Sequence, residues 1–499
     1  MLYFRNKDEG KMKLFLYNNT KNFAILTKRW FSLLFNRALK NPILMKIVFG
    51  KNSTKYLKYQ QQRHQGPRKS ICHAPHLSMY FGIDGVVRPC CRNKAYTYGS
   101  YPNSTIVCIW NNSNRINLIK HLNKSDLSQG CLECYNHLFS ENFSAVVAKM
   151  FDYQKKRKKY PTILEFELDN TCNLECIMCA GKLSSSIRAN RENLPNHSST
   201  YDSEFVNQLE EFIPYLEEAR FYGGEPFLIQ IYYEIWERII ALNPSTKIYV
   251  QTNGTILNDK IKTLLKKGKF VINISIDAID KELFEKIRKN SNYNIVMKNL
   301  AYFHNYCIQN NTFFCITPTF MRENWMEFPK IVEFCNNRNI PLFYNTLYRP
   351  RNLAINTLKS SQIKEISEYL NSFCFISQNN IQKRNNLQYS GFISLLKTWL
   401  NDKIEEEEKN TRKFIGKDII INNIISNLRK NPACTENPEL LKKIEFFTIK
   451  VIGLLSDENE ILAFEELVLN TPISKIVDEI SNLEKFDNDL LLKYLKNYL

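Results

Sequence analysis

The sequence predicts an α/β protein: a partial (β/α)6-type barrel, preceded by a small cysteine-rich β-hairpin domain and followed by a helical tail. From Pro161 onward, short runs of β-branched and aromatic residues alternate with segments whose apolar residues recur every three or four positions. Strands and helices that alternate in this way form parallel sheets with crossover helices. Before Pro161, cysteine, glycine and turn residues are concentrated between residues 71 and 136, which is typical of a small loop-rich module.

Six strands are expected in the barrel, and their carboxyl ends are where the chemistry of such folds is found. The expected strands are 163–168, 219–223, 247–252, 270–276, 313–319 and 341–347. Helices with apolar residues at helical spacing are expected at 204–213, 231–242, 259–267 and 282–289.

The chain divides into four predicted regions. These are a basic N-terminal extension and linker at 1–68, a cysteine-rich domain at 69–150, the barrel at 160–376, and a mostly helical region of unassigned role at 377–499. Within the second region, Asp84-Gly85 is expected to form the tight turn of a β-hairpin. The acidic run 405–408 is expected to be a solvated helix or loop.

Composition and charge limit the cellular location and the binding partners that can be expected for the protein. Lys and Arg exceed Asp and Glu by 68 − 50 = 18, but no Arg-rich stripe interleaved with aromatic residues is present, so nucleic acid is not a favoured partner. No segment reaches the roughly 20 apolar residues that a membrane-spanning helix needs. The closest, 23–50, is interrupted by charged residues and is compatible with weak contact to a membrane surface. The first twenty residues have no signal-peptide pattern, so a cytoplasmic protein is predicted.

The fourteen cysteines argue for metal ligation or buried thiols rather than a disulfide framework, because no secretion signal is recognised. Six of them occur singly in apolar surroundings and are predicted to be buried. These are Cys108, Cys307, Cys315, Cys335, Cys374 and Cys434. The other eight form two groups.

The first group directly follows the strand predicted at 163–168, in the run DNTCNLECIMCAG. Cys172, Cys176 and Cys179 have C-x3-C-x2-C spacing, and thiolates are the usual ligands of iron–sulfur clusters. Three cysteines can hold three irons of a cubane and leave the fourth iron open to the amine and carboxylate of a small molecule. Zinc is the alternative, but a structural zinc site needs a fourth ligand, and no further Cys or His lies nearby.

This loop resembles the signature of the radical S-adenosylmethionine (SAM) superfamily, and the resemblance extends over about residues 161–375. The second strand ends in YGGEP, which resembles the element of the family that receives the methionine amino group. Gly223 and Gly224 would let the backbone approach a ligand closely, and Glu225 would accept from an ammonium group. Pro226 completes the element.

The third and fourth strands extend the resemblance. It implies that Asn253 belongs to the cofactor site, that Ser275 and Asp277 lie near the ribose, and that Arg288 pairs with the methionine carboxylate. The alternatives are a turn residue for Asn253, a helix N-cap for Asp277 and a surface charge for Arg288. Met178 stands where many members of the family have an aromatic residue near the adenine, and a thioether can also pack on a purine.

The activity that this resemblance implies is reductive cleavage of SAM. An electron from a [4Fe–4S] cluster would break the sulfonium bond and give methionine and a 5′-deoxyadenosyl radical, which abstracts hydrogen from a substrate. A flavodoxin- or ferredoxin-like protein would be the external electron donor. In such enzymes the cofactor supplies the difficult chemistry, and the protein positions it.

The second group resembles the SPASM or twitch domain, which binds an auxiliary iron–sulfur cluster. The resemblance implies four ligands, Cys72, Cys90, Cys131 and Cys134. Cys91 can replace Cys90, because neighbouring residues on a strand point to opposite faces. Structural zinc on four thiolates remains an alternative. In this chain the module precedes the barrel, whereas in the family it more often follows it.

Members of the superfamily with an auxiliary cluster often modify peptides or proteins. The resemblance therefore implies a peptide or protein side chain as substrate. A small molecule, such as a sugar or nucleoside derivative, is the second hypothesis, and a non-catalytic iron–sulfur protein for redox sensing or electron transfer is the third. No residue of the sequence is identified as a catalytic acid or base.

Overall fold

A computed structural model describes residues 54–63, 66–93, 95–139, 141–153, 159–409, 416–430, 432–435 and 437–470, with single residues between 473 and 495. Residues 1–53 lie outside this part, and so does the apolar stretch 23–50. No helix among the described residues is long and apolar enough to cross a membrane. The chain forms two compact units: a helical unit from Met1–His73 and Ile116–Lys155, and a sheet unit from Ala74–Arg115 and Lys156–Leu499.

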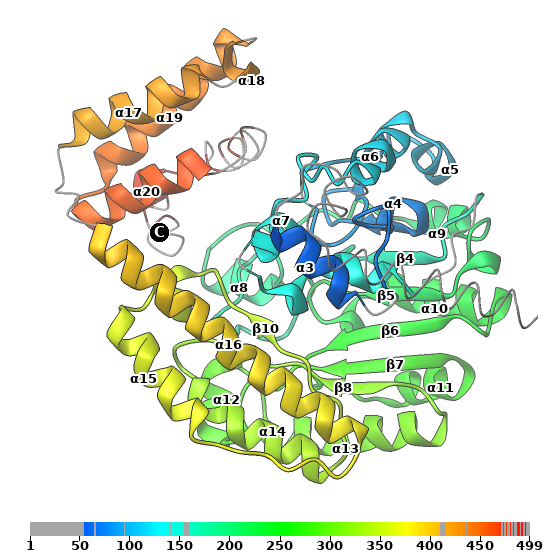
Figure 1. Ribbon diagram of the computed structural model, residues 1–499. Coiled ribbons are helices and arrows are strands. Elements are labelled where there is room, and N and C mark those ends of the chain that lie inside the picture. Colours follow the sequence, from blue (N-terminus) through cyan, green and yellow to red (C-terminus); the bar gives the residue numbers. More distant parts are fainter. Residues whose placement is uncertain are drawn as a thin grey trace, which may run out of the picture. The chain divides into compact units, whose positions relative to one another are not determined.

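The sheet unit is built on one eight-stranded sheet with the order β3-β2-β1-β4-β5-β6-β7-β8 (Figure 1). Its parallel part consists of β4 (Ile163–Phe166), β5 (Glu218–Phe221), β6 (Lys247–Thr252), β7 (Lys269–Ile274) and β8 (Phe314–Ile316). These are five of the six expected strands, in the expected order. The sheet is open, with β3 and β8 at its edges, so the predicted α/β fold with a mostly parallel, unclosed sheet is confirmed.

The sixth expected strand, 341–347, does not extend this sheet as a full strand. It contributes one isolated bridge, between Ile316 and Leu342, and the short β10 (Asn345–Thr346), which pairs with β9 (Thr319–Phe320) in a second sheet. The prolines account for the difference. Pro318 and Pro341 have no backbone N–H to donate to a ladder, so regular pairing stops at each of them.

The expected hairpin forms, but its strands belong to the main sheet. β1 (Ser78–Phe81) pairs antiparallel with β2 (Val86–Arg88), which in turn pairs with β3 (Gly99–Ser100). The turn is stabilised by Asp84, whose carboxylate accepts from the Val86 nitrogen at 3.2 Å. On its other side β1 pairs in parallel with β4. The cysteine-rich segment 69–150 is therefore divided between the two units, and its hairpin extends the sheet that carries the first cysteine group.

Helices cover the apolar face of the sheet. Phe166, Phe221, Val250 and Ile272 lie opposite one another in neighbouring strands, and Phe221 contacts the ring of Phe166 (centroids 4.9 Å apart) and of Trp236 (5.4 Å). The helices between and after these strands are α9 (Ser203–Leu209), α10 (Gln230–Leu242), α11 (Asp259–Lys267), α12 (Lys281–Ile287), α13 (Tyr293–Gln309) and α14 (Phe328–Asn337). Because side chains alternate along a strand, the other face receives a different set, which is polar.

Up to residue 409, the sheet unit contains further helices and 3₁₀ turns. They are α4 (Ala74–Leu77), α5 (Ile106–Trp110), α8 (Ser185–Asn190), α15 (Ser360–Asn371), α16 (Asn380–Lys409), and the 3₁₀ turns η3 (Ile213–Tyr215), η4 (Pro226–Leu228), η5 (Trp325–Glu327), η6 (Arg351–Leu353) and η7 (Ile355–Thr357). Of the six isolated cysteines, Cys307, Cys315, Cys335 and Cys434 are buried as predicted, whereas Cys108 and Cys374 are exposed.

Helix α16 begins the region predicted at 377–499, yet it packs on α14 and α15. Its buried Asn385 accepts from the Leu342 nitrogen at 2.8 Å and donates to Asn336 Oδ1 at 3.0 Å. Further along, α17 (Lys417–Arg429), α18 (Pro432–Thr435), α19 (Pro438–Leu454) and α20 (Glu458–Asn470) share an apolar cluster of their own. The last region is therefore helical as expected, but its first helix is part of the core of the sheet unit.

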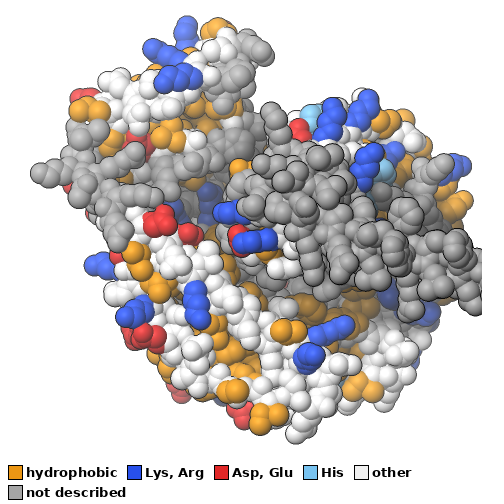
Figure 2. All heavy atoms as spheres, viewed as in Figure 1, with side chains coloured by type: hydrophobic (Ala, Val, Ile, Leu, Met, Phe, Trp, Pro, Cys, Tyr) orange, Lys and Arg blue, Asp and Glu red, His pale blue; other side chains and the backbone are white. Residues whose placement is uncertain are grey.

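The helical unit contains α3 (Thr54–Gln62), most of α6 (Ser113–Asn123), α7 (Leu132–Phe139), η1 (Phe143–Ala145) and η2 (Val147–Phe151). Helix α3 packs on α7 and buries Tyr56 and Tyr59. The expectation that residues up to 68 form a linker is therefore wrong for α3. On the face shown in Figure 2, the Lys and Arg side chains that are described lie scattered among apolar and acidic ones rather than in one stripe.

Candidate cofactor site at the carboxyl ends of the strands

The loop that carries the first three cysteines leaves the carboxyl end of β4 and is fixed at the start of α8. The Cys172 nitrogen donates to Ser185 Oγ at 3.1 Å, and Ser186 Oγ donates to the Cys172 carbonyl at 2.7 Å. Asn170 Nδ2 donates to the carbonyl of Gly181 at 2.8 Å and closes the loop on itself. The cysteines therefore lie on a segment whose two ends are held together by hydrogen bonds.

The middle of the loop is attached to the end of α12. The Ile177 nitrogen donates to the Ile287 carbonyl at 2.9 Å, and the Glu175 nitrogen donates to the Lys289 carbonyl at 3.0 Å. An ion pair of 3.0 Å between Lys289 Nζ and Glu175 Oε2 reinforces this attachment. Cys176 lies between these two backbone contacts, so its position depends on α12 as well as on β4.

The three thiols are half-buried, and burial controls their acidity. It raises the pKa of Cys172 to about 11 and that of Cys179 to about 12. Burial also raises the pKa of Cys176, although the nearby guanidinium of Arg288 acts in the opposite direction. At neutral pH the metal-free thiols are therefore protonated, and iron must displace their protons when it binds.

The donor set fits an iron–sulfur cluster. Within the described part of the chain, no three His, Cys, Asp or Glu side chains converge as the ligands of a single metal ion do. A [4Fe–4S] cluster does not require such convergence, because each of its thiolates binds a different iron. Three thiols spread over one anchored loop therefore suit a cluster better than they suit a zinc ion.

The Gly223-Gly224 pair allows the loop after β5 to lie directly against the cysteine loop. The Gly224 nitrogen donates to the Asp169 carbonyl at 3.1 Å. A Cβ atom on Gly223 would lie 2.5 Å from the Asp169 carbonyl oxygen, and one on Gly224 would lie 2.2 Å from that of Thr171. The glycines were expected to admit a ligand; here they admit the neighbouring loop. Pro226 then begins η4.

Glu225 is fully buried, and its carboxylate is surrounded by donors. It accepts from Thr252 Oγ1 at 2.7 Å, from the Asn253 nitrogen at 2.7 Å and from the Phe227 nitrogen at 3.2 Å. Burial nevertheless raises the pKa of Glu225 to about 7. A buried carboxylate with a raised pKa favours a cationic neighbour, because a positive charge stabilises its ionised form.

Asn253 connects the end of β6 to the cysteine loop. Its Nδ2 donates to Asn173 Oδ1 at 3.0 Å and lies 4.0 Å from the sulfur of Cys172. Its Oδ1 accepts from the Thr255 nitrogen at 2.9 Å, so the residue also has the turn role that was the alternative to a role in the site. Ser275, after β7, accepts from Gln251 Nε2 at 2.8 Å on the polar face of the sheet.

Asp277 and Arg288 form a buried ion pair, with 2.8 Å between Asp277 Oδ2 and Arg288 Nη2. The other oxygen of Asp277 accepts from the Thr319 nitrogen at 2.7 Å. Asp280, not Asp277, caps α12, and Arg288 is not a surface charge, so both alternative interpretations are wrong. Arg288 Nε has no hydrogen-bond partner among the described atoms, which leaves one buried donor available to a ligand.

Met178 lies on the apolar side of the cysteine loop. Together with Ile177 it packs against a small cluster of Ile287, Met321 and Leu347. The Met178 side chain therefore lies against apolar residues rather than charged ones.

The polar face of the sheet carries further residues that the sequence did not single out. Glu165 and Arg220 lie opposite each other on β4 and β5, with 3.8 Å between their charged atoms, and Tyr222 Oη donates to Glu165 at 3.3 Å. Tyr232 Oη accepts from the Leu168 nitrogen at 2.9 Å and holds the start of the cysteine loop. Only the alternation of Glu165 with apolar neighbours signals a polar face; nothing in the sequence signals Tyr232.

The second cysteine group is divided between the units. Cys72, Cys131 and Cys134 belong to the helical unit, whereas Cys90 and Cys91 belong to the sheet unit. Cys131 directly precedes α7, Cys134 lies on it, and Cys90 is more deeply buried than Cys91. Arg63, which donates to the Ser70 carbonyl two residues before Cys72, and Tyr59, whose ring lies under Arg63, were missed by the sequence analysis. Their signal was present: Tyr56, Tyr59 and Arg63 repeat at the spacing of one helix face.

Comparisons with known proteins give a family match over the part of the chain that contains the first cysteine group. Residues 167–335 match the model of the radical SAM superfamily. The chain is 27% identical over 154 residues to the GTP 3′,8-cyclase of Limosilactobacillus fermentum, which is 31% of this chain and 44% of that protein. It is 30% identical over 142 residues to the GTP 3′,8-cyclase of Streptomyces coelicolor, which is 28% of this chain and 40% of that protein. The chain thus spans less than half the length of these curated relatives.

Among solved structures, the chain is similar to anSMEcpe with bound AdoMet (17% identity, TM-score 0.33, 42% of this chain and 58% of that one). It is also similar to Streptococcus suis SuiB bound to its precursor peptide SuiA (16% identity, TM-score 0.31, 48% and 50%). The superfamily match covers the cysteine loop, the Gly223-Gly224 loop and the ends of β6 and β7. Residues 167–335 therefore form a domain that matches the radical SAM superfamily.

Proposed function

We propose that this chain binds a [4Fe–4S] cluster through Cys172, Cys176 and Cys179 and cleaves SAM reductively to start radical chemistry on a substrate. When bound, the cluster supplies the electron that splits SAM into methionine and a 5′-deoxyadenosyl radical, which takes hydrogen from the substrate. One observation carries the proposal: the Glu225 nitrogen donates to the Thr171 carbonyl at 2.8 Å, so the carboxylate loop and the thiol loop are joined one residue before Cys172.

The residues around this junction have distinct proposed roles. Glu225 accepts from the methionine ammonium group, because its raised pKa makes a cationic neighbour favourable. Arg288 offers its unpartnered Nε to the methionine carboxylate. The Asp277 carboxylate is held by the ion pair with Arg288 and by the hydrogen bond from the Thr319 nitrogen, so in this proposal Asp277 acts by positioning Arg288 rather than by touching the ribose.

Other residues of the site complete the SAM pocket in this proposal. Ser275 faces the ribose, Met178 packs against the adenine, and Asn253 holds the cysteine loop through Asn173. Gly223, Gly224 and Pro226 shape the loop that presents Glu225. These residues bind and orient SAM and exclude water from it, whereas the bond cleavage itself is the chemistry of the cofactor.

The second cysteine group is proposed to bind an auxiliary iron–sulfur cluster. Cys72, Cys131 and Cys134 supply three thiolates, and Cys90, or its alternative Cys91, supplies a fourth. Removing each of these two thiols in turn and measuring iron distinguishes them.

A peptide or protein side chain is the proposed substrate, supported by the likeness of the second cysteine group to auxiliary-cluster domains of peptide-modifying enzymes. A nucleotide is the second candidate, because the curated relatives are named GTP 3′,8-cyclases. Incubation with deuterium-labelled candidates of each class decides between them, since the true substrate transfers deuterium to 5′-deoxyadenosine.

The test of the proposed function is the formation of 5′-deoxyadenosine by anaerobically reconstituted protein given SAM and dithionite. The variant Cys176→Ala should lose this product, while Cys374→Ser, which changes an exposed thiol outside the site, should keep it. Product formation at the wild-type rate by Cys176→Ala would rule out the assigned cluster. A protein with a full complement of iron that never cleaves SAM, with any candidate substrate, would favour a redox or binding role.

A further inference from the structure

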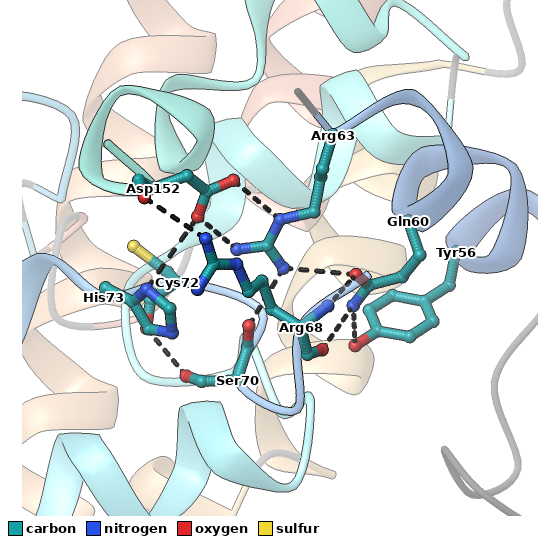
Figure 3. A network of polar contacts seen from close by, with 8 residues as sticks. All are labelled: Tyr56, Gln60, Arg63, Arg68, Ser70, Cys72, His73 and Asp152. Carbon is teal, nitrogen blue, oxygen red and sulfur yellow. Dashed lines mark hydrogen bonds and ion pairs between the residues drawn. The ribbon is translucent and has the colours of Figure 1, made fainter. Parts of the chain in front are cut away.

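Helix α3 of the helical unit ends in a buried ion pair beside Cys72 (Figure 3). Arg63 directly follows the helix, and its Nε donates to Asp152 Oδ2 at 2.8 Å, while its Nη2 bonds the other oxygen of the same carboxylate. The two side chains are 0% and 1% exposed. A bidentate contact of this kind fixes the guanidinium in orientation as well as in position.

The ion pair holds the turn that contains Cys72. Arg63 Nη1 donates to the Ser70 carbonyl at 2.9 Å, and Ser70 Oγ donates to the Cys72 carbonyl at 2.7 Å. On the other side of the cysteine, His73 Nδ1 lies 3.8 Å from Asp152 Oδ1. The residues before and after Cys72 are thus both attached to the same pair.

The network continues back along α3. Gln60 Oε1 accepts from the Arg68 nitrogen at 2.9 Å, and Gln60 Nε2 donates to the Arg68 carbonyl at 3.0 Å. Tyr56 Oη lies 2.6 Å from Gln60 Nε2 and accepts from Ser125 Oγ at 2.7 Å. Each of these buried polar groups has a partner within the unit.

Tyr59 is the exception on this helix face. Its side chain is fully buried between Arg63 and Phe143, and its hydroxyl has no hydrogen-bond partner among the described atoms. Burial raises the pKa of Tyr59, and the thiols of Cys72 and Cys134 add to this effect. A buried hydroxyl without a partner is costly. The ring of Tyr59 lies under the guanidinium of Arg63, at 5.5 Å, and that guanidinium holds the turn that contains Cys72.

We propose that helix α3 is a functional part of the auxiliary cluster site: the Arg63–Asp152 pair positions Cys72, and Tyr59 donates its hydroxyl hydrogen to a sulfur of the bound cluster. The inference rests on the proposed function, which supplies the cluster. Arg63 acts through Cys72 and is a positioning residue, because its own charge is already matched by Asp152. Hydrogen bonds to sulfur are among the factors that set the potential of such clusters, so Tyr59 has a measurable role.

Positioning is tested by hydrogen exchange on the metal-free full chain. Replacing both partners, Arg63→Met with Asp152→Leu, removes the pair without leaving a lone buried charge. Amides of residues 66–73 should then exchange about tenfold faster, because the turn opens more often. Lys58→Met is the matched control, since it removes an exposed pair of 2.8 Å between the same helix and Glu141. Unchanged exchange in the double variant would overturn the positioning role.

If the double variant does not fold, Arg63→Lys provides the same test. A lysine keeps the charge but cannot make the bidentate contact with Asp152 and also reach the Ser70 carbonyl. Faster exchange at 66–73 is expected here too, and exchange equal to that of the wild type would count against the inference.

The hydroxyl is tested by measuring the potential of the auxiliary cluster in a full chain in which Cys172, Cys176 and Cys179 are replaced by alanine. In that background Tyr59→Phe should lower the reduction potential and leave iron content and the unfolding temperature undiminished. Tyr56→Phe, which removes a hydroxyl that already has partners, should not shift the potential. Absence of iron from the background would contradict the auxiliary cluster itself and this inference with it. Iron present with an unshifted potential in Tyr59→Phe would contradict the inference alone.

Discussion

Glu225 accepts a hydrogen bond from the backbone nitrogen of Asn253 at 2.7 Å, and this contact joins the loop after β5 to the loop after β6. Through its amide group Asn253 then reaches Asn173 on the cysteine loop. Three loops from three neighbouring strands are thus connected through one carboxylate. Because the pKa of Glu225 is raised in the folded chain, the free energy of unfolding of the domain should depend on pH.

We expect Glu225 to make stability depend on pH between about 4.5 and about 7. Because its pKa is raised from 4.5 to about 7 in the folded chain, the folded state holds this proton more tightly than the unfolded state. The contribution is fully present below pH 4.5 and is lost as pH rises through 7, by about 3 kcal/mol at 1.36 kcal/mol per pKa unit. The unfolding temperature of the wild type should therefore fall relative to that of Glu225→Gln over this range.

The comparison is made by following thermal unfolding of the metal-free protein across pH. Glu225→Gln also disturbs the hydrogen bonds of the carboxylate, but the resulting loss of stability does not change with pH. It therefore leaves the slope of the unfolding temperature against pH unaffected. Glu234→Gln, an exposed carboxylate on α10, is the control and should follow the wild type. Parallel curves for the wild type and Glu225→Gln would contradict the raised pKa.

Gly224→Ala should weaken the first cluster site without touching a ligand. Its new Cβ would lie 2.2 Å from the Thr171 carbonyl oxygen, so either the cysteine loop or the Glu225 loop has to move. Overpacking of this kind costs about 1–3 kcal/mol. Reconstituted protein should bind less iron than the wild type, as measured by iron analysis and by the absorbance of the cluster.

Gly453→Ala is the matched control for that substitution. Gly453 lies inside α19 with nothing within 4 Å of an added Cβ, so alanine should be neutral or stabilise the helix by about 0.5–1 kcal/mol. Normal iron content in Gly224→Ala would mean that the close approach of the two loops is not what holds the cysteines in place.

The strands of the sheet unit could be predicted from the sequence because each combines β-branched and aromatic residues with a turn or helix on either side. The carboxyl ends of these strands also indicated that the cysteine loop, Glu225 and Asn253 lie at one edge of the sheet. Hydrogen bonds join the three loops there. The partner of β1 could not be predicted in this way. Its parallel pairing with β4 joins Ser78 to Ile163, far apart in the sequence, and no local pattern records such a pairing.

Helix α3 was missed for a different reason. Its sequence, TKYLKYQQQ, is polar in composition, and polar composition was taken to indicate a linker. The spacing of Tyr56, Tyr59 and Arg63 is what marks the buried face. The pairing of Arg288 with Asp277 could also not be predicted from the sequence, because nothing in the local pattern of either residue indicates the other as its partner.

Arg288→Met should destabilise the sheet unit and abolish SAM binding. It would leave the Asp277 carboxylate buried without its ion-pair partner, which costs about 3–5 kcal/mol. The double variant Arg288→Met with Asp277→Leu should recover most of the stability, because no uncompensated charge is left. It should not recover SAM binding, since the donor for the methionine carboxylate is still missing. Calorimetric titration with SAM that shows wild-type affinity in the double variant would contradict the assigned role of Arg288.

The sheet unit is expected to need no residue beyond α16 (Asn380–Lys409) to fold and to bind its cofactors. A chain stopped after Lys409 should keep the iron content and SAM cleavage of the full-length protein, because α17, α19 and α20 bury their apolar residues in a cluster of their own. A chain stopped after Ile376 should be insoluble or unfolded. It loses Asn385, which satisfies the Leu342 nitrogen, and Phe392, whose ring packs on Phe320 and Phe328 with centroids 5.4 and 5.3 Å apart.

The two truncations are compared by size-exclusion chromatography and by circular dichroism at equal concentration. The substitution Asn385→Ala in the chain stopped after Lys409 separates the hydrogen bonds from the apolar packing. It leaves the buried Leu342 nitrogen without an acceptor and should cost about 1–3 kcal/mol, while Phe392 stays in place. If the chain stopped after Ile376 were folded and bound iron, α16 would be an accessory to the domain. Failure of both chains would mean instead that the last helices are needed for the sheet unit to fold.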